Sequence, residues 1–168
     1  IDISDVSIEK AKKNSIGMDI KYSVDNCEKS NFNDEKFDLV YGSGIIHHLD
    51  TKICVSEIYR ILKRDGKMIF IEPLGTNPII NLYRFLTPRS RSSDEHPLIK
   101  KDFKTIKELF KNLSVRYYGL LTLLFLPFYK SPEKSKIFKI LSKLDQCLFK
   151  IKILRIFAWS VLITCKKN

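Results

Sequence analysis

The sequence predicts an α/β fold with a mostly parallel sheet covered by helices on both faces. Two observations support this prediction. Short apolar or β-branched segments alternate with amphipathic helical segments through most of the 168 residues, and such alternation is typical of a parallel sheet. The length suits a single domain with a substantial core, so residues 1–168 are treated as one domain.

The first segments alternate between helix and strand. Val6–Ser15 is predicted as a helix that Ser4 or Asp5 can cap and that Gly17 ends. The alternating, β-branched segment Asp19–Val24 is predicted as a strand. A polar loop follows.

The middle of the chain carries two apolar strand candidates around a helix. Phe37–Tyr41 is apolar and ends at the glycine-containing turn 42–44, as a buried strand would. Asp50 or Thr51 caps a helix whose apolar residues share one face. Asp65-Gly66 is predicted to turn the chain into the strand Lys67–Ile71.

The remaining segments continue the alternation with longer interruptions. Asn77–Leu86 is predicted as a short apolar helix or a structured loop, and Pro88–Pro97 as a polar loop. Periodicity predicts two more helices, Ile99–Lys111 and Ser135–Phe149. It also predicts two more strands, Leu113–Tyr118 and Trp159–Cys165.

Polar residues stand where the predicted strands end. Ligands of parallel sheets bind beyond the carboxyl ends of the strands. The residues at those ends are Asp2, Asp25, Asn26, Gly42, Ser43, Gly44 and Glu72. Each also has a plain structural interpretation: Asp2 as a helix cap, Asp25 and Asn26 as turn residues, and the glycines as an ordinary loop.

Four segments in this order resemble the class I S-adenosylmethionine-dependent methyltransferases, which have a Rossmann-like fold. They are Ile1–Ser4, the strand and turn Phe37–Leu49, the helix and turn Glu57–Gly66 with the strand Lys67–Pro73, and an ending in which an insertion precedes a last strand. Each motif is weak alone, but four at the right spacing are a strong signal. The resemblance implies an antiparallel C-terminal strand, preceded by a helical insertion.

The resemblance implies S-adenosylmethionine as cofactor. Asp2 would bind the ribose hydroxyls, Ile3 would pack on adenine, and Asn26 or Asp25 would accept a hydrogen bond from the adenine amino group. The turn Gly42–Gly44 would approach the cofactor. The family's first strand and its Gly-rich loop have no counterpart before Ile1, so we expect an N-terminally truncated domain that is inactive by itself.

The substrate side is less defined by sequence. His47, Glu72 and His96 are candidates there, with His96 a candidate base on a loop. His47 and His48 could also be structural; no metal site is expected, because no other ligand stands at a suitable spacing. Residues 74–98 and 119–157 are expected to be substrate-side insertions.

Charge is unevenly distributed along the chain. Residues 1–75 hold 11 basic and 13 acidic residues, whereas residues 76–168 hold 19 and 6. A solvated basic face explains this, and so does an anionic partner such as a membrane surface, a substrate or nucleic acid. Three interpretations of the apolar run Gly119–Tyr129 stay open: it packs on the sheet as core, it lines a pocket for an apolar substrate, or it contacts an anionic membrane as part of residues 119–155. The nearby lysines are Lys130, Lys134, Lys136 and Lys139.

These observations predict a cytoplasmic methyltransferase, with peripheral membrane contact as a variant, acting on a small molecule that could be apolar or lipid-like. The four separated cysteines suit a reducing compartment. The alternatives are an RNA methyltransferase, suggested by the basic second half, and a non-catalytic domain of the same fold that binds a partner or membrane. Nucleic acid is the less favoured partner.

Overall fold

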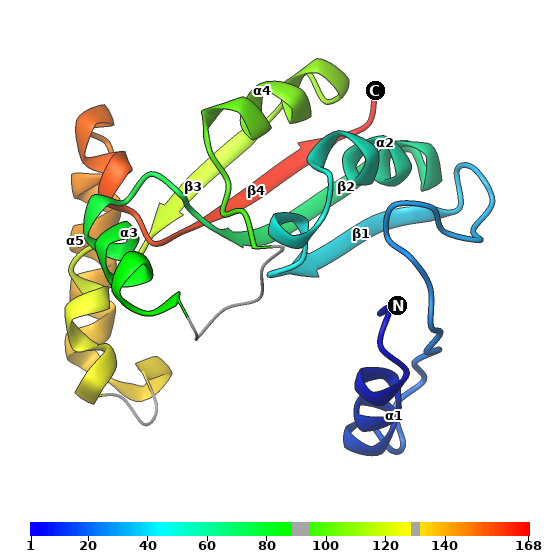
Figure 1. Cartoon of the computed structure of the whole chain (residues 1–168), viewed down its shortest axis with the longest axis horizontal. Coiled ribbons are helices and arrows are strands. Elements are labelled where there is room, and N and C mark those ends of the chain that lie inside the picture. Colours follow the sequence, from blue (N-terminus) through cyan, green and yellow to red (C-terminus); the bar gives the residue numbers. More distant parts are fainter. Residues whose placement is uncertain (89–94, 129–131) are drawn as a thin grey trace.

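A four-stranded sheet organises the computed structural model, which describes residues 1–88, 95–128 and 132–168. The strands are β1 (Phe37–Ser43), β2 (Leu62–Pro73), β3 (Ser114–Tyr118) and β4 (Ser160–Lys166), in the order β1-β2-β4-β3 (Figure 1). β1 and β2 are parallel, and β4 runs antiparallel to both β2 and β3. Three strands therefore share one direction and the last strand opposes them, which confirms the predicted fold class and the antiparallel C-terminal strand.

β2 begins earlier than the sequence predicts. It starts at Leu62, directly after the preceding helix, and the predicted Asp65-Gly66 turn lies within it. Phe37 pairs with Leu62 and Leu39 pairs with Lys67, so β2 advances five residues while β1 advances two. The predicted turn is therefore a bulge within β2. Asp65 takes a left-handed φ of 65°. The bulge stays paired because the Asp65 N–H donates to Lys167 O and Gly66 O accepts from Lys167 N.

Two helices cover one face of the sheet. α2 (Thr51–Ile61) is capped by Asp50, whose side chain accepts from Ile53 N, and packs beside α4 (Lys100–Leu109) (Figure 1). Alternate residues of β2 and β4 point toward these helices and are buried. The core contains Met68, Phe70, Ile106, Phe110, Val161 and Ile163.

The opposite face is more open. Leu39, Tyr41 and Ile71 are 51%, 63% and 40% exposed there. α1 (Asp5–Asn14), capped by Ser4, lies apart from the strands, beyond the β1 edge of the sheet (Figure 1). The cap is Ser4 and not Asp2, because Ser4 Oγ accepts from Ser7 N while Asp2 Oδ1 accepts from Ser4 N.

The predicted strand Asp19–Val24 is wrong. Only Val24 forms a bridge, to Asp2, and this bridge is not part of the four-stranded sheet. A strand needs a neighbour along its whole length to satisfy its backbone groups. Residues 19–23 have no such neighbour, and Ile20 is half-exposed.

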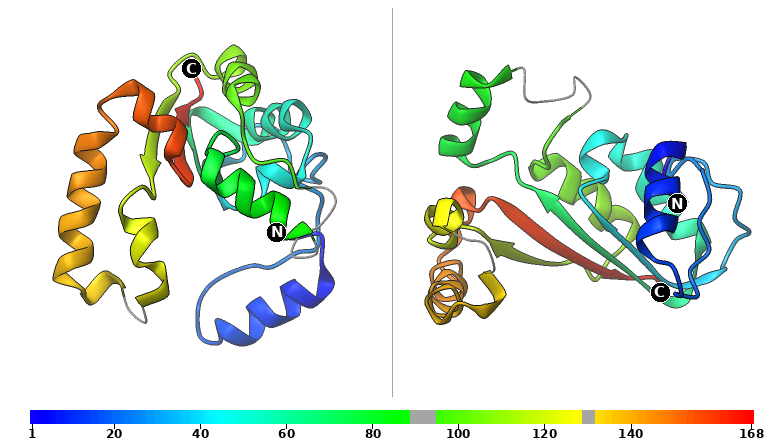
Figure 2. Two further views of the ribbon diagram at one scale, coloured as in Figure 1. Left: turned by 60° about the vertical axis from the view of Figure 1, so that its left-hand side comes forward. Right: turned by 90° about the horizontal axis from the view of Figure 1, so that it is seen from below.

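Short helices gather at the end of the sheet where β2 and β3 finish (Figures 1 and 2). They are α3 (Pro78–Leu86), α5 (Lys136–Leu148) and the 3-10 helices η3 (Thr122–Phe128), η4 (Pro132–Lys134) and η5 (Lys152–Phe157). The predicted helices in these regions are thus confirmed. Part of the Pro88–Pro97 loop, Tyr129 and Lys130 lie outside the described residues.

A buried carboxylate joins α5 to the start of η3. Asp145 is 2% exposed and accepts hydrogen bonds from the backbone N–H groups of Leu120, Leu121 and Thr122 at 2.7–3.3 Å, and from Thr122 Oγ1 at 2.7 Å. A carboxylate with four donors is satisfied without a cation.

We expect Asp145→Ala to destabilise the protein by about 1.5–3 kcal/mol, because it leaves buried N–H groups without an acceptor. Glu108→Ala, which removes an exposed acid from α4, is the control and should change stability by less than about 0.5 kcal/mol. Urea unfolding measures both. Equal stabilities of the two variants would contradict the role of Asp145.

Candidate functional site

The turn after β1 is built around glycines. A Cβ on Gly42 would clash with the ring of Phe70, so packing within the sheet alone explains this glycine. Gly44 adopts a left-handed φ of 63°, and a Cβ there would meet only His47 Cε1, at 3.7 Å. Gly44 is therefore required by backbone conformation, and it turns the chain into the short helix η1 (Ile46–His48).

Glu72 holds this turn in place. Its side chain lies at the end of β2, is fully buried, and its Oε1 accepts from Ile45 N and Ile46 N at 3.0 Å each. Its Oε2 lies 2.8 Å from His47 Nδ1. Of the two roles considered for Glu72, capping a turn and facing the substrate, the structure shows the first.

The contact with Glu72 fixes the orientation of the His47 ring. When His47 Nδ1 carries the hydrogen of this bond, Glu72 Oε2 is the acceptor. The side chain is 11% exposed. This arrangement is that of an oriented general base, in which a carboxylate fixes the ring and stabilises the imidazolium.

The other two histidines lie near His47. The rings of His47 and His48 are 4.1 Å apart, centre to centre. His96 donates its backbone N–H to His47 O at 2.8 Å, which brings the end of the 74–98 region to the turn. Among the residues that the structure describes, no group of three or more His, Cys, Asp or Glu is arranged to hold a metal ion.

A pocket of about 290 Å³ lies between the N-terminal residues, β1 and α2. Its wall includes Asp2 on one side and Gly42–Gly44 on the other, with Val40, Ile58 and Phe70 as apolar surface. Its size is near the lower end of small-molecule sites, about 300–1,000 Å³. Asp2, Gly42, Ser43 and Gly44 are thus brought together as the cofactor assignment requires.

Three predicted cofactor residues do not line this pocket. Ile3 is 74% exposed. Asp25 accepts from Asn31 N and Asn31 Nδ2 at 3.1 Å, and Asn26 Oδ1 accepts from Glu28 N at 2.8 Å. Both polar side chains order their own loop, which agrees with their interpretation as turn residues. Their contact with a cofactor stays a prediction.

The pocket also contains residues that sequence analysis missed. Cys27, Ser30, Cys54 and Glu57 line it. Glu57 accepts from Ser30 N at 2.9 Å, from Ser30 Oγ at 2.6 Å and from Arg60 Nη2 at 2.6 Å. The hydrogen bond with Arg60, and next those with Ser30, lower the pKa of Glu57 to about 2.

The sequence gives one indication of the Glu57–Arg60 ion pair, namely that the two residues are three positions apart on one helix face. Ser30 lies 27 residues away from Glu57, and nothing in its local pattern marks it. Burial raises the pKa of the Cys54 thiol to about 12, so this cysteine stays protonated and acts as an apolar wall residue.

Comparison with known proteins supports the resemblance. Residues 1–70 match the family model described as a methyltransferase domain. A comparison with curated proteins finds no significant match. Solved structures with the same fold include an S-adenosylmethionine-dependent methyltransferase from Archaeoglobus fulgidus, with a TM-score of 0.63 and 18% identity. It aligns over 99% of this chain and 74% of its own.

Two further structures carry ligands of this enzyme class. The N-methyltransferase NodS from Bradyrhizobium japonicum, in complex with S-adenosyl-l-homocysteine, gives a TM-score of 0.60 at 10% identity over 99% of this chain and 64% of its own. Geranyl diphosphate methyltransferase in complex with S-adenosylmethionine gives a TM-score of 0.61 at 12% identity. It aligns over 99% of this chain and 67% of its own.

The match over residues 1–70 and the shared fold agree with the resemblance to class I S-adenosylmethionine-dependent methyltransferases. Within residues 1–88, 95–128 and 132–168, no helix has both the length and the apolar character needed to cross a bilayer.

We expect the pocket wall formed by Glu57 to weaken in acid. The folded pKa is about 2 against an ordinary 4.5, so this stabilisation is complete above about pH 4.5 and is lost as pH falls through about 2. It amounts to at most about 3 kcal/mol. Glu57→Gln removes the titrating group while keeping the shape of the side chain.

Thermal unfolding between pH 6 and pH 2 (roughly the range of carboxylate titration) should show a shallower loss of stability for Glu57→Gln than for the unaltered protein. Glu108→Gln, which changes an exposed acid outside the pocket, serves as the control. Parallel curves for all three proteins would show that Glu57 does not carry this pH dependence.

Proposed function

We propose that this protein, a class I S-adenosylmethionine-dependent methyltransferase by fold and by its match over residues 1–70, methylates a small molecule that could be apolar or lipid-like. The observation that supports a catalytic role best is the pair of His47 and the fully buried Glu72, joined at 2.8 Å. Glu72 also accepts backbone N–H groups of the turn, so its contact with the His47 ring is the part of this arrangement that capping the turn does not require.

The pocket beside Asp2 fits the cofactor. Asp2 would accept hydrogen bonds from the ribose hydroxyls, and Val40, Ile58 and Phe70 offer apolar surface for the base. When bound, S-adenosylmethionine supplies an electrophilic methyl group on a sulfonium. Asp2, through its bridge to Val24, also holds the N-terminal segment against the next loop.

His47 would handle the proton of the acceptor. Its Nε2 takes the proton from the hydroxyl or amine that is to be methylated, and the Glu72 carboxylate stabilises the imidazolium formed. The backbone contact between His96 and His47 would keep residues 95–98 beside the acceptor.

An apolar acceptor is supported by exposed apolar side chains at the end of the sheet where β2 and β3 finish (Figure 1). α3 has no buried residue, and Phe85 is 80% exposed on it. In η3, Leu124 is 70% exposed, so this part of the apolar run is not core. These residues suit an apolar acceptor, or a peripheral contact of 119–155 with an anionic membrane. Geranyl diphosphate methyltransferase shows that the fold accommodates one such substrate.

The test is transfer of tritiated methyl groups from S-adenosylmethionine into a cell extract, fractionated into small molecules, lipids, protein and RNA. We expect label in the small-molecule or lipid fraction. Label in RNA would favour the alternative of an RNA methyltransferase. No label at all would favour a non-catalytic domain or the truncated, inactive domain expected from the sequence.

In that assay His47→Gln should reduce labelling about 10²-fold or more, because loss of a general base costs 10²–10⁴-fold. His96→Gln, at an exposed side chain beside the same turn, is the comparison and should retain most labelling. Cofactor affinity by calorimetry should be equal in both variants. Full labelling by His47→Gln would exclude His47 as the base.

Asp2→Ala should weaken S-adenosylmethionine binding by about 1.5–3 kcal/mol, roughly tenfold or more, because it removes a charged acceptor. Asp5→Ala changes an exposed acid in the first turn of α1, outside the pocket, and is the matched control. Calorimetry measures both. An unchanged affinity for Asp2→Ala would show that another residue binds the ribose.

A further inference from the structure

A second pocket lies between η5, the start of α4 and the end of β3. It has a volume of about 380 Å³. Three of the residues lining it are cations, Lys100, Lys152 and Arg155, and its aromatic wall consists of Phe103 and Tyr117. Among the residues that the structure describes, no acid lines it. It shares no residue with the pocket beside Asp2.

The acid of α4 next to this pocket in sequence is hydrogen-bonded elsewhere. Asp102 accepts from Ile99 N at 2.8 Å and from Thr51 Oγ1 at 3.1 Å. Arg155 is held by a 2.8 Å bond from Nε to Phe149 O and lies 5.4 Å from the centre of the Tyr117 ring. Three cations around one pocket make the local potential positive, which favours an anionic ligand.

The rim of this pocket is apolar and exposed. Ile153 and Ile156 of η5 line it and are 70% and 39% exposed. α3 is joined to the same helix, because Asn77 Nδ2 donates to Phe157 O and Thr76 Oγ1 donates to Ile156 O. Apolar side chains of α3 are exposed beside it: Ile79 66%, Leu82 59%, Phe85 80% and Leu86 67%.

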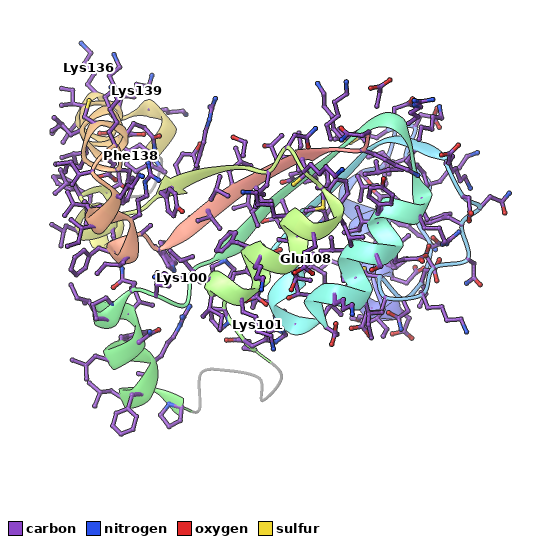
Figure 3. The ribbon with its side chains drawn as sticks, turned by 90° about the horizontal axis from the view of Figure 1, so that it is seen from above. Lys100, Lys101, Glu108, Lys136, Phe138 and Lys139 are labelled. Atoms are coloured by element: carbon purple, nitrogen blue, oxygen red, sulfur yellow. The ribbon has the colours of Figure 1, made fainter. Side chains whose placement is uncertain are left out.

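α5, which leads into η5, adds the same combination of exposed apolar and basic residues. Ile137, Ile140 and Leu144 follow helical spacing and are 46–58% exposed. Lys136 and Lys139 extend from the same helix (Figure 3). Residues 134–157 contain seven basic residues and one acid, Asp145, which is buried and fully hydrogen-bonded.

We propose that this pocket binds the phosphate of an anionic lipid while the exposed apolar side chains of α3 and η5 enter the membrane interface. Lys100 and Lys152 meet the phosphate, and Phe103 and Tyr117 contact the apolar part of the same molecule. This proposal extends the membrane contact proposed above. It depends on that contact only because the membrane supplies the anionic lipid.

A lipid explains both features of this surface, whereas the alternatives explain one. Free phosphate would need the cations and not the exposed Ile153 or the apolar α3. RNA would need the cations and would favour aromatic stacking surfaces over a rim of isoleucine and leucine. Interfacial binding requires an apolar strip flanked by basic residues.

The test is sedimentation of the protein with vesicles of phosphatidylcholine, and with vesicles of an equal mixture of phosphatidylcholine and phosphatidylglycerol, at low and moderate salt. The pocket variant is Lys100→Glu/Lys152→Glu. The matched control is Lys101→Glu/Lys104→Glu, which makes the same charge change on exposed residues of α4 that do not line the pocket. Inorganic phosphate and a single-stranded RNA are added as competitors.

We expect binding to the anionic vesicles only, weakened about tenfold or more in the pocket variant and about twofold or less in the control. Equal losses in both variants, or equal binding to neutral vesicles, would overturn the proposal. Displacement by inorganic phosphate would show a free-phosphate site, and displacement by RNA a nucleic-acid site; either would overturn the lipid assignment. Affinity for S-adenosylmethionine, measured separately, tests the methyltransferase assignment independently.

Discussion

The candidate site depends on the carboxylate of Glu72 at the end of β2. It is fully buried and binds the turn after β1 through three backbone N–H groups and one imidazole. Since an ionised carboxylate is stable in the interior only when donors surround it, the turn and the carboxylate require each other. This contact couples the ends of two parallel strands, and both the pocket wall at Gly44 and the orientation of His47 follow from it.

The elements near Glu72 could be predicted from sequence because their signals are local. The apolar segment Phe37–Tyr41, the glycine turn and the Asp50 cap specify β1, its turn and α2 through short-range preferences. Asp2 and Gly44 were predicted at the pocket from their places at strand ends. The pairing of Glu72 with His47 was not predicted, because it joins residues 25 positions apart and no local pattern encodes that distance.

The same reasoning explains what sequence missed elsewhere. Asp19–Val24 has strand propensity, yet a strand also needs a neighbour, and propensity contains no information about neighbours. Gly42 lines the pocket beside Asp2, and its lack of a Cβ also accommodates Phe70, a packing contact that its place in the sequence does not indicate. Ser30 and Cys27 reach the same pocket from a loop, and the position of Ser30 depends on its contact with Glu57 of α2 rather than on periodicity.

Charge is distributed differently in the two halves of the molecule. In the first half, the carboxylates of Asp2 and Glu57 line one pocket, and Glu57 bonds to Arg60 as well as to Ser30. In the second half, Lys100, Lys152 and Arg155 line a pocket that contains no acid among the described residues. The first pocket includes the end of β1, and the second includes residues at the ends of β2 and β3, so both lie at the end of the sheet where these strands finish. One end of the sheet therefore presents carboxylates and cations on separate elements, as the proposed cofactor and the proposed anion each require.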